Sequence, residues 1–252
     1  FYIYRLRHRV DMEQQLANIK LRFFTDISHE LRTPLTLISS PVTEVLENEP
    51  LSPSAREHLT LVHQNTERML RLMNQILDFR KFEDGKLQLR LSQFDLHASL
   101  LEWADAFRTL SFRKHIHFQI DADADTDFTV TADAEKLERI VYNLLSNSFK
   151  FTPENGQISM HLSSCTKNGE PAVRLQVTDT GVGMPAEHVR HIFDSFYQID
   201  VHHAGSGIGL ALVKSFVEMH HGTISVDTTE GQGTCFTIEI PACQSGTLDP
   251  DT

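Results

Sequence analysis

One histidine of this chain lies among groups that suit it to act as a nucleophile. Residues 23–37 read FFTDISHELRTPLTL, in which apolar side chains recur at every third or fourth position and predict an amphipathic helix. His29 lies off the apolar stripe, so we expect its imidazole to face solvent, with Glu30 beside it and Thr33 on the same helix face. Pro34 removes one helix hydrogen bond and is expected to bend the helix. A neutral imidazole attacks through one nitrogen while a carboxylate binds the other N–H, although a lone His-Glu pair is more often an ordinary surface feature.

A stripe of amide and amine side chains is expected on a helix over 133–149. Asn143, Asn147 and Lys150 follow one another at intervals of four and three residues, at the edge of the apolar face of that helix. An amide oxygen can bind Mg²⁺ and an ammonium group can bind phosphate oxygens, so this stripe is suited to a metal-bound phosphate. Taken alone, the stripe is better explained as a solvated helix face.

Three clusters of glycine follow in the second half of the chain. Residues 179–183, DTGVG, come directly after an apolar strand, where glycines let the backbone approach a flat ligand and the carboxylate can accept from an amino group. Residues 205–210, GSGIGL, open a helix whose first turn offers N–H groups to phosphate, and 231–234, GQGT, precede the last strand. The cluster at 205–210 is not the dinucleotide fingerprint, and it lacks the Lys-Ser/Thr of a P-loop. Each cluster alone predicts only a tight turn, but the clusters and the amide stripe together favour a binding site.

Two long helices must position the histidine. The helical pattern runs from about residue 8 to 46, prolines interrupt it within 48–53, and a second apolar seam covers 59–77. A short turn between two long helices predicts an antiparallel hairpin. Its apolar face is wider than one hairpin can bury, so packing predicts a homodimer that forms a four-helix bundle.

The periodicity changes after residue 85, where strands and helices mix. This mixture, with hairpins of antiparallel type at the end, predicts an α+β sandwich with one sheet and helices on one face. The tail after residue 241 has the composition of a linker. Asp95 and Asp133 are the expected N-caps of two of the helices. We expect strands at 87–91, 115–120, 128–131, 158–162, 173–177, 223–226 and 234–240, and helices at 95–112, 133–149 and 206–220.

Composition and charge exclude several classes of protein. The chain has 252 residues, enough for one or two domains, and 40% of them are hydrophobic, as in ordinary globular domains. A formal net charge of −11 argues against binding of nucleic acid, which needs a basic surface. The 3 cysteines lack a C-x-x-C spacing and fit a reducing compartment, and the 14 histidines show no set with zinc-ligand spacing.

The start of the chain predicts a position next to a membrane. Residues 1–4 are aromatic and apolar, and Arg5, Arg7 and Arg9 follow, which is the pattern at the cytoplasmic end of a membrane span. We therefore expect attachment to a membrane through a segment that precedes residue 1. A fraying helix start is the alternative.

These motifs, in this order, resemble those of the sensor histidine kinases, and the resemblance covers almost the whole chain. The stretches similar to the H, N, G1, F and G2 boxes of that family are 29–35, 143–153, 179–183, 193–196 and 205–210. The resemblance implies the cytoplasmic portion of an inner-membrane sensor, with an ATP-binding sandwich of the Bergerat type that gyrase and Hsp90-type ATPases share. It implies a juxtamembrane coiled-coil helix over 1–15, a dimerisation and histidine-phosphotransfer domain over 16–84, a catalytic ATP-binding domain over 85–242 and a linker-like tail over 243–252.

The resemblance also implies a role for each motif. His29 takes the γ-phosphoryl group of ATP on one ring nitrogen, and Glu30 orients or deprotonates the ring. Thr33 places a water when the same helix dephosphorylates a partner. The phosphoryl group passes to an aspartate of a response-regulator receiver domain, which is fused or separate. Asn147 coordinates Mg²⁺ with support from Asn143.

The remaining implied contacts are to the nucleotide. Lys150 steadies phosphate, Asp179 accepts a hydrogen bond from the adenine amino group, and glycines let a lid over about 195–206 wrap the triphosphate. The other residues implied in nucleotide binding are Gly181, Gly183, Gly205, Gly207, Gly209, Leu210 and Thr234.

Three positions depart from the pattern of the family. Gln198 stands where a basic residue often follows the F box, so a charged contact to the γ-phosphate is missing or comes from elsewhere, with Arg190 and Lys214 as candidates. Ser148 and Phe151 stand where alanine and tyrosine are usual, and we expect both to be tolerated.

Two other classes of protein fit parts of the chain. A gyrase- or Hsp90-like ATPase uses the same kind of pocket but has no need of the hairpin, and it releases phosphate without forming a phosphoprotein. A non-catalytic dimeric scaffold is supported only by Gln198, and it fails to bind nucleotide.

Overall fold

The structure is a computed structural model that describes residues 31–124, 126–199 and 206–243. The chain divides into two compact units, Phe1–Leu87 and Gln88–Thr252. None of the described helices combines the length and the apolar composition needed to span a bilayer. The juxtamembrane prediction for residues 1–9 lies outside the described residues.

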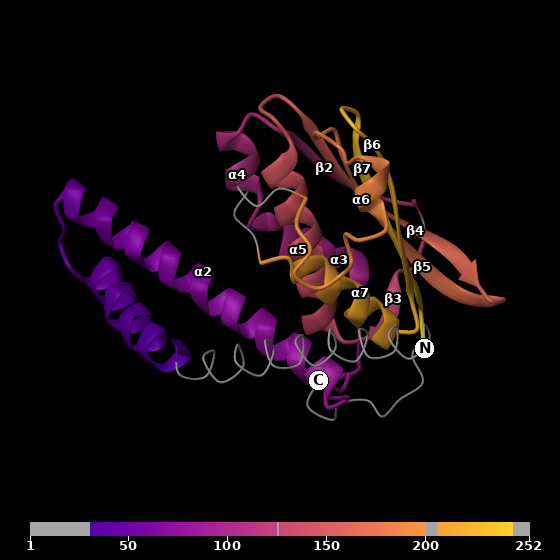
Figure 1. The fold of residues 1–252 in the computed structure, drawn as a ribbon, viewed down its shortest axis with the longest axis horizontal. Helices are drawn as coiled ribbons and strands as arrows, with labels where there is room; N and C mark the ends of the chain where they lie inside the picture. Colours follow the sequence, from indigo (N-terminus) through magenta and orange to yellow (C-terminus); the bar gives the residue numbers. More distant parts are fainter. Residues whose placement is uncertain (1–30, 125, 200–205, 244–252) are drawn as a thin grey trace, which may run out of the picture. The chain divides into compact units, whose positions relative to one another are not determined.

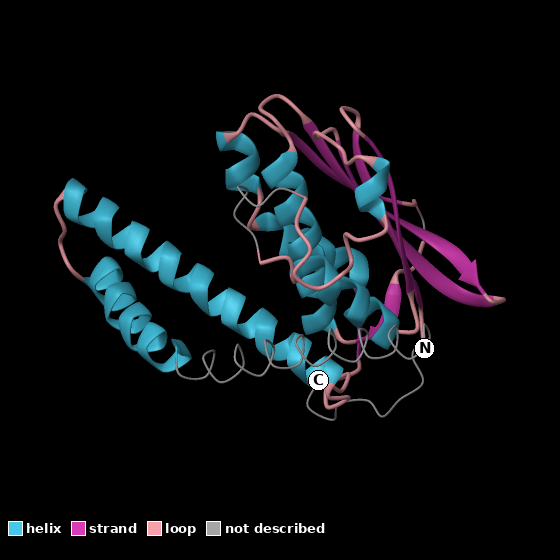
Figure 2. Ribbon diagram, in the orientation of Figure 1, coloured by secondary structure: helices cyan, strands magenta, loops and turns pink. Residues whose placement is uncertain are grey.

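The described part of the first unit is a pair of helices joined by a short turn (Figure 1; Figure 2). Residues 31–48 are helical, and α2 (Pro53–Glu83) follows. The side chain of Ser52 accepts a hydrogen bond from the backbone N–H of Ala55, and proline is the first helical residue. Both features favour a helix start at this point of the chain.

Polar side chains fix the register of these two helices. Ser39 Oγ donates to Glu67 Oε1 over 2.8 Å. Arg32 Nη2 donates to Asn74 Oδ1 over 2.6 Å. The two contacts are seven positions apart on each helix, and they follow in opposite order along the two helices, as antiparallel helices require. The predicted antiparallel hairpin is therefore confirmed.

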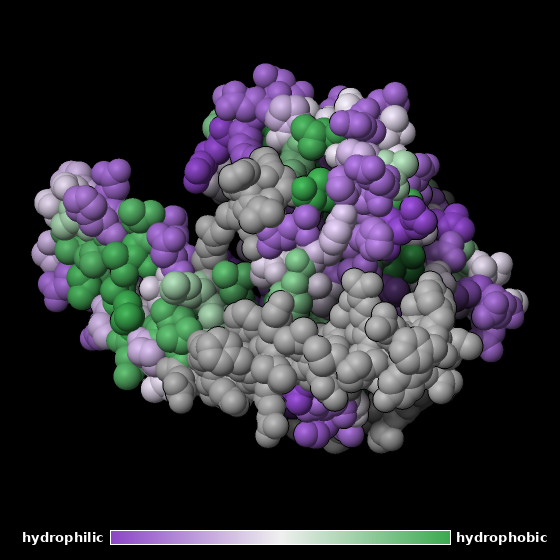
Figure 3. Space-filling view, in the orientation of Figure 1, coloured by the Kyte–Doolittle hydropathy of each residue, from purple (hydrophilic) through white to green (hydrophobic). Residues whose placement is uncertain are grey.

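Apolar side chains stay exposed along one face of the hairpin, and Figure 3 shows them gathered there. Leu31 and Ile38 are seven residues apart, as are Val62 and Met69, and each of the four is between 40% and 51% exposed. Heptad spacing places the members of each pair on one face of their helix. An exposed apolar stripe of this kind is typical of a surface that a second pair of helices covers.

The described part of the second unit contains two sheets (Figure 1). The smaller sheet pairs β1 (Ser92–Asp95) with β3 (Thr129–Ala132) in antiparallel fashion. The larger has the order β2-β4-β5-β7-β6, in which β2 and β4 are parallel and all other neighbours are antiparallel. Its strands are β2 (His117–Ala122), β4 (Gln157–Lys167), β5 (Glu170–Asp179), β6 (Thr223–Thr229) and β7 (Gly233–Pro241).

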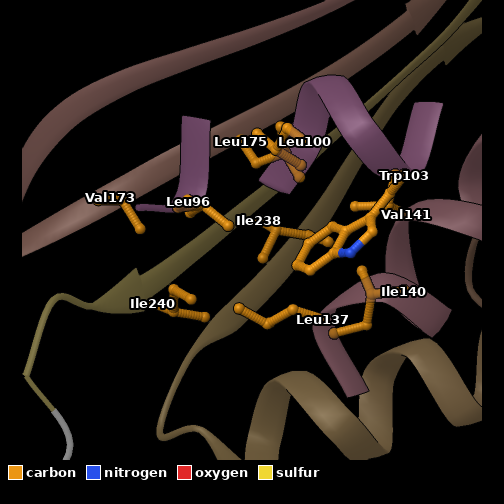
Figure 4. A pocket seen from close by; sticks show the side chains of 10 residues that line it. All are labelled: Leu96, Leu100, Trp103, Leu137, Ile140, Val141, Val173, Leu175, Ile238 and Ile240. Carbon is orange, nitrogen blue, oxygen red and sulfur yellow. The ribbon is translucent and has the colours of Figure 1, made fainter. Parts of the chain in front are cut away.

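Helices α3 (Leu96–Asp105), α5 (Ala134–Phe151) and α7 (Gly209–Met219) cover one face of the larger sheet (Figure 1). Alternate residues of β5 and β7 are buried, as expected for strands that are covered on one face. The predicted α+β sandwich is therefore confirmed. The side chains that meet between helices and sheet include Leu100, Trp103, Leu137, Ile140, Leu175 and Ile238 (Figure 4).

The strand predicted over 87–91 is wrong. Residues 87–90 are irregular, and the first strand, β1, begins at Ser92. The backbone N–H of Arg90 donates to Asp133 Oδ2 over 2.8 Å, so a side chain takes the place that a neighbouring strand would have. Alternating leucines therefore mark a half-buried irregular segment here, and not a strand.

The helix predicted over 95–112 is in fact two helices, α3 and α4 (Arg108–Arg113). Asp95 caps α3 as predicted, because its side chain accepts from the N–H of Ala98. Between the two helices the ring of Phe107 stacks on Phe149 of α5, with 5.3 Å between centroids and 17° between planes. Burial of this ring accounts for the break, which a pattern of apolar spacing does not reveal.

The end of the described chain returns to the smaller sheet. The backbone N–H of Thr131 donates to the carbonyl of Ala242 over 2.8 Å, and Thr131 forms a parallel bridge with Cys243. The strand β3 therefore pairs both with β1 and with the segment that follows β7.

Candidate active site

The polar stripe of α5 lies beside the start of α7. Asn143 and Asn147 are half-buried, and Lys150 is exposed. Asn143 Nδ2 donates to the carbonyl of Arg139 over 2.7 Å, which leaves its amide oxygen directed elsewhere. A Cβ added to Gly209, the first residue of α7, would lie 2.8 Å from Asn143 Oδ1. The structure thus brings the amide of Asn143 and the backbone of Gly209 into near contact.

A carboxylate is buried where β5 ends. Asp179 is 6% exposed, and its Oδ1 accepts from the N–H of Gly181 over 2.9 Å. Its Oδ2 accepts from Ser148 Oγ of α5 over 3.0 Å. Burial raises the pKa of the Asp179 carboxyl above its ordinary value, while these two bonds and a third from the Thr234 backbone oppose that rise. A carboxylate with a donor on each oxygen has a fixed direction, as recognition of an amino group requires.

Ser148 belongs to this site, although the sequence suggests only that it is tolerated. It is 1% exposed on the apolar face of α5, and its hydroxyl reaches Asp179. Buried hydroxyl groups are nearly always hydrogen-bonded. A serine on an otherwise apolar helix face is therefore the signal that could have indicated a partner.

Two glycines of the motifs have backbones that a side chain would obstruct. Gly183 has φ +63°, and a Cβ there would overlap the backbone of Thr229. Gly207 has φ +69°, and a Cβ there would lie 2.6 Å from the carbonyl carbon of Phe196. The N–H of Phe196 also donates to the carbonyl of Gly207 over 2.8 Å. The F and G2 boxes are therefore in direct backbone contact, while Gly205 lies outside the described residues.

Thr234 lies opposite Asp179 on the neighbouring strand, β7, and is 8% exposed. Its Oγ1 lies 3.0 Å from Thr228 Oγ1. The N–H of Met184 donates to Thr228 Oγ1 over 3.1 Å. Thr228, which sequence reasoning did not single out, therefore connects the loop after β5 to the side chain of Thr234. Its only signal was a polar side chain on the face of β6 that Ile224 and Val226 share.

The helix α7 begins at Gly209, three residues after the predicted start. The positive φ of Gly207 is incompatible with a right-handed helix, so the helix cannot begin earlier. Ser206 Oγ accepts from the N–H of Ile208 over 3.3 Å. Leu210 is half-buried in the first turn of α7.

The structure does not assign the missing basic contact to either candidate. Lys214 Nζ lies 3.9 Å from Glu218 Oε1, one turn along α7. Arg190 is exposed and follows the short helix α6 (Ala186–Val189).

Of the three catalytic residues that the sequence predicts, the structure describes one. Thr33 is exposed on the helix over 31–48. His29 and Glu30 lie outside the described residues.

Two family models match the two units of the chain. Residues 19–85 match the His Kinase A (phospho-acceptor) domain. Residues 132–244 match the model described as histidine kinase-, DNA gyrase B- and HSP90-like ATPase. A phosphoacceptor domain followed by an ATPase of this kind is the arrangement of one family. The chain belongs to the sensor histidine kinases.

Curated relatives of this kinase are much longer than the chain. Hybrid signal transduction histidine kinase D of Dictyostelium discoideum is 34% identical over 241 residues, which are 94% of this chain and 16% of that protein. The circadian input-output histidine kinase CikA of Thermosynechococcus vestitus is 35% identical over 254 residues, which are 97% of this chain and 34% of that protein. The kinase described here therefore spans about a third or less of the length of these relatives.

Solved histidine kinases share the fold. Full-length ShkA in complex with AMPPNP aligns with a TM-score of 0.71 at 28% identity, over 90% of this kinase and 47% of that chain. The catalytic domain of histidine kinase ThkA, in a nucleotide-free form, aligns with a TM-score of 0.54 at 27% identity, over 61% of this kinase and 96% of that chain. A helical hairpin followed by an ATP-binding sandwich is therefore the fold of this kinase.

Proposed function

We propose that this kinase transfers the γ-phosphoryl group of ATP to His29 and then to an aspartate of a response-regulator receiver domain. The observation that carries the proposal is the buried carboxylate of Asp179, which accepts from the Gly181 N–H and from Ser148 Oγ. An ionised acceptor in a buried site favours a ligand with an amino group and disfavours one with a carbonyl group at that point. Adenine carries such an amino group.

The phosphate end of the nucleotide is expected beside α5 and α7. The first turn of α7 has N–H groups with no partner inside the helix, and such groups favour phosphate. Among the described residues, no three His, Cys, Asp or Glu side chains converge as metal ligands. The amide oxygens on α5 are oxygen ligands of the kind that Mg²⁺ prefers. Asn147, supported by Asn143, is the residue that we expect to bind Mg²⁺, and Lys150 contacts phosphate oxygens. Bound there, Mg²⁺ would supply positive charge beside the phosphate oxygens.

The chemistry needs positioning more than covalent help from the protein. One ring nitrogen of His29 attacks the γ-phosphorus, the bond from phosphorus to the bridging oxygen breaks, and ADP leaves. Glu30 binds or accepts the proton of the other ring nitrogen. An aspartate carboxylate of the receiver then attacks the phosphorus, and the N–P bond breaks. Thr33 places a water molecule when the same helix dephosphorylates that partner: the water attacks the phosphorus, the bond to the aspartate oxygen breaks, and inorganic phosphate leaves.

Partners and domain limits complete the proposal. The exposed apolar face of the hairpin and the match to the phosphoacceptor model support a homodimer with a four-helix bundle. We assign dimerisation and phosphotransfer to 16–84, ATP binding to 85–242, a juxtamembrane helix to 1–15 and a linker to 243–252. Attachment to the inner membrane through a segment before residue 1, with the kinase in the cytoplasm, stays a prediction.

Labelling with radioactive ATP tests the nucleophile. His29→Gln should carry no acid-labile, base-stable phosphate, because the attacking nitrogen is absent, while isothermal titration with Mg-ATP should show unchanged binding. His58→Gln changes an exposed histidine of α2 in the same unit and should label as the unaltered kinase does. Labelling of His29→Gln at the level of this control would refute the assignment of His29.

The same assay separates the alternatives. A gyrase- or Hsp90-like ATPase releases free phosphate without any phosphohistidine, and a scaffold binds no nucleotide. The match of residues 19–85 to a phosphoacceptor domain favours the kinase over both.

A further inference from the structure

A buried histidine connects the two helices that border the proposed nucleotide site. His220 follows the last residue of α7 and is 0% exposed. Its Nδ1 lies 2.7 Å from the carbonyl oxygen of Phe216 in the preceding turn. Its Nε2 accepts from the backbone N–H of Asp133 over 3.1 Å. Because Asp133 is the N-cap of α5, this ring joins the end of α7 to the beginning of α5.

The two bonds determine where the ring proton lies. A carbonyl oxygen only accepts, so Nδ1 carries the hydrogen, and a backbone N–H only donates, so Nε2 carries none. The ring is therefore neutral, and a second proton on Nε2 would oppose the N–H of Asp133. Burial lowers the pKa of His220 below its ordinary value, and the Phe216 carbonyl and the Asp133 charge only oppose this shift. The charged or titratable groups that face the ring are Asp133 and Lys136 of α5 and the adjacent His221.

Asp133, to which His220 is hydrogen-bonded, is itself held by several hydrogen bonds. Asp133 is 2% exposed, and its Oδ1 accepts from the N–H of Lys136 over 3.1 Å. Its Oδ2 accepts from Lys136 Nζ over 2.6 Å and from the N–H of Arg90 over 2.8 Å. The carboxylate thus has bonds to α5 and to the segment before β1. A group bonded in this way cannot follow α7 if α7 moves.

The far end of the same two helices forms part of the proposed nucleotide site. The helices α5 and α7 lie side by side and run antiparallel, because His220 is beside Asp133 and Gly209 is beside Asn143 (Figure 1). At about 1.5 Å per residue, each helix covers about 15 Å between its two contacts. The two helices are thus joined by a hydrogen bond at one end and approach closely at the other, and we call this pair the α5–α7 frame.

We propose that His220 is a positioning residue for nucleotide binding, which in its neutral form fixes α7 against the cap of α5 and thereby fixes the Gly209 backbone against Asn143. The inference rests on the proposed function, since it requires the α5–α7 frame to bind Mg-ATP. If the bond from Asp133 is lost, α7 is free to shift along α5. A shift of about 1 Å in the backbone that contacts phosphate is enough to weaken its interactions with the nucleotide. The apparent affinity then falls with the fraction of molecules whose helices are aligned.

Two substitutions of His220 separate its two bonds. In His220→Gln an amide oxygen takes the place of Nε2 and can accept from Asp133, whereas the shorter amide of His220→Asn takes only the place of Nδ1. By isothermal titration with Mg-ATP at neutral pH, we expect His220→Gln to bind within about twofold of the unaltered kinase and His220→Asn to bind about three- to tenfold more weakly. His221→Asn is the control, because His221 is exposed and has φ +54°, which asparagine tolerates.

The pH dependence of the affinity for Mg-ATP distinguishes a positioning role of His220 from a role in folding alone. Protonation of His220 removes the acceptor for Asp133, and because burial lowers the pKa of His220, affinity of the unaltered kinase should fall only at a pH below the ordinary histidine pKa of about 6.5. His220→Gln should lack this component of the acid fall.

Each outcome of these titrations decides the proposal. His220→Asn that binds as tightly as the control overturns it, as does His220→Gln that fails to fold or to bind. The proposal is also overturned if the affinity of the unaltered kinase and that of His220→Gln depend on pH in the same way. If His220→Asn does not fold, this comparison of pH profiles is the deciding measurement. An unaltered kinase that binds no Mg-ATP contradicts the proposed function instead.

Discussion

Replacement of Ser148 by alanine should separate the packing of α5 from its hydrogen bond to the nucleotide site. Ser148 is 1% exposed and donates to Asp179 Oδ2 over 3.0 Å. Alanine fills the same space apart from the hydroxyl group, so the main loss is the donor. Asp179 remains buried with one hydrogen bond fewer.

The size of the effect follows from two opposing contributions. A hydrogen bond to a charged group stabilises a protein by about 1.5–3 kcal/mol. Alanine is a better helix former than serine by about 0.5 kcal/mol, which offsets part of the loss. At neutral pH we therefore expect Ser148→Ala to lower the free energy of unfolding of the second unit by about 1–2.5 kcal/mol.

The loss should depend on pH in a defined direction. Burial raises the pKa of folded Asp179 above its unfolded value, so its contribution to stability is present below the unfolded pKa and is lost as the pH rises through the folded pKa. The bond from Ser148 stabilises the ionised form and opposes this loss. Without it, the unit is less stable where Asp179 is ionised, and the difference shrinks in acidic buffer as the carboxyl takes up its proton.

Urea denaturation followed by tryptophan fluorescence measures this difference. Trp103 is the only tryptophan of the chain and is half-buried against the core of the second unit, so its fluorescence reports that unit. Ser146→Ala is the matched control, because Ser146 is exposed on the same helix and alanine there changes only helix propensity. If Ser148→Ala unfolds at the same urea concentration as Ser146→Ala, or if its loss is as large in acidic buffer, the reasoning about Asp179 is wrong.

Two further predictions concern the lid and the dimer. Gly207→Ala should weaken Mg-ATP binding at least about tenfold, because its Cβ would lie 2.6 Å from the Phe196 backbone and φ is positive, a strain of about 1–3 kcal/mol before the clash is counted. Gly169→Ala, which also has positive φ but meets no atom within 4 Å, is the control, and equal binding by the two variants would contradict the prediction. Met69→Glu should shift the kinase toward monomer in analytical ultracentrifugation, because it places a charge on the exposed apolar stripe. Gln64→Glu, on an exposed position of the same helix, should not.

Local signals in the sequence were sufficient for most of the fold. The spacing of apolar residues in α5 and its cap at Asp133 predict a helix over 133–149. The observed helix ends only two residues later, at Phe151. The hairpin of the first unit follows from two long apolar seams and a proline turn. The segment 87–90 was misassigned because a side chain 43 residues away along the chain, that of Asp133, bonds its backbone, and no local pattern records such a bond.

Some residues of the candidate site can also be recognised from the local sequence, whereas others depend on distant partners. Motif residues such as Asp179 and Asn143 are recognised from their neighbours in sequence. The role of Ser148 can be recognised only when its partner, Asp179, is known, and that residue is 31 positions away in the sequence. The role of His220 is harder still to predict from the sequence. It is one of two adjacent histidines at the end of a helix, and the residue that it bonds, Asp133, is 87 positions away.

The double pairing of β3 has a mechanical consequence. The chain reaches the second unit at β1 and, after β7, comes back to the same strand at Thr131. That strand leads through Ala132 straight into Asp133. Both ends of this unit are therefore tied to the strand that leads into the cap of α5, and the N–H of Ala242 also donates to the carbonyl of Pro171 in β5, so tension on the C-terminal end loads both sheets together.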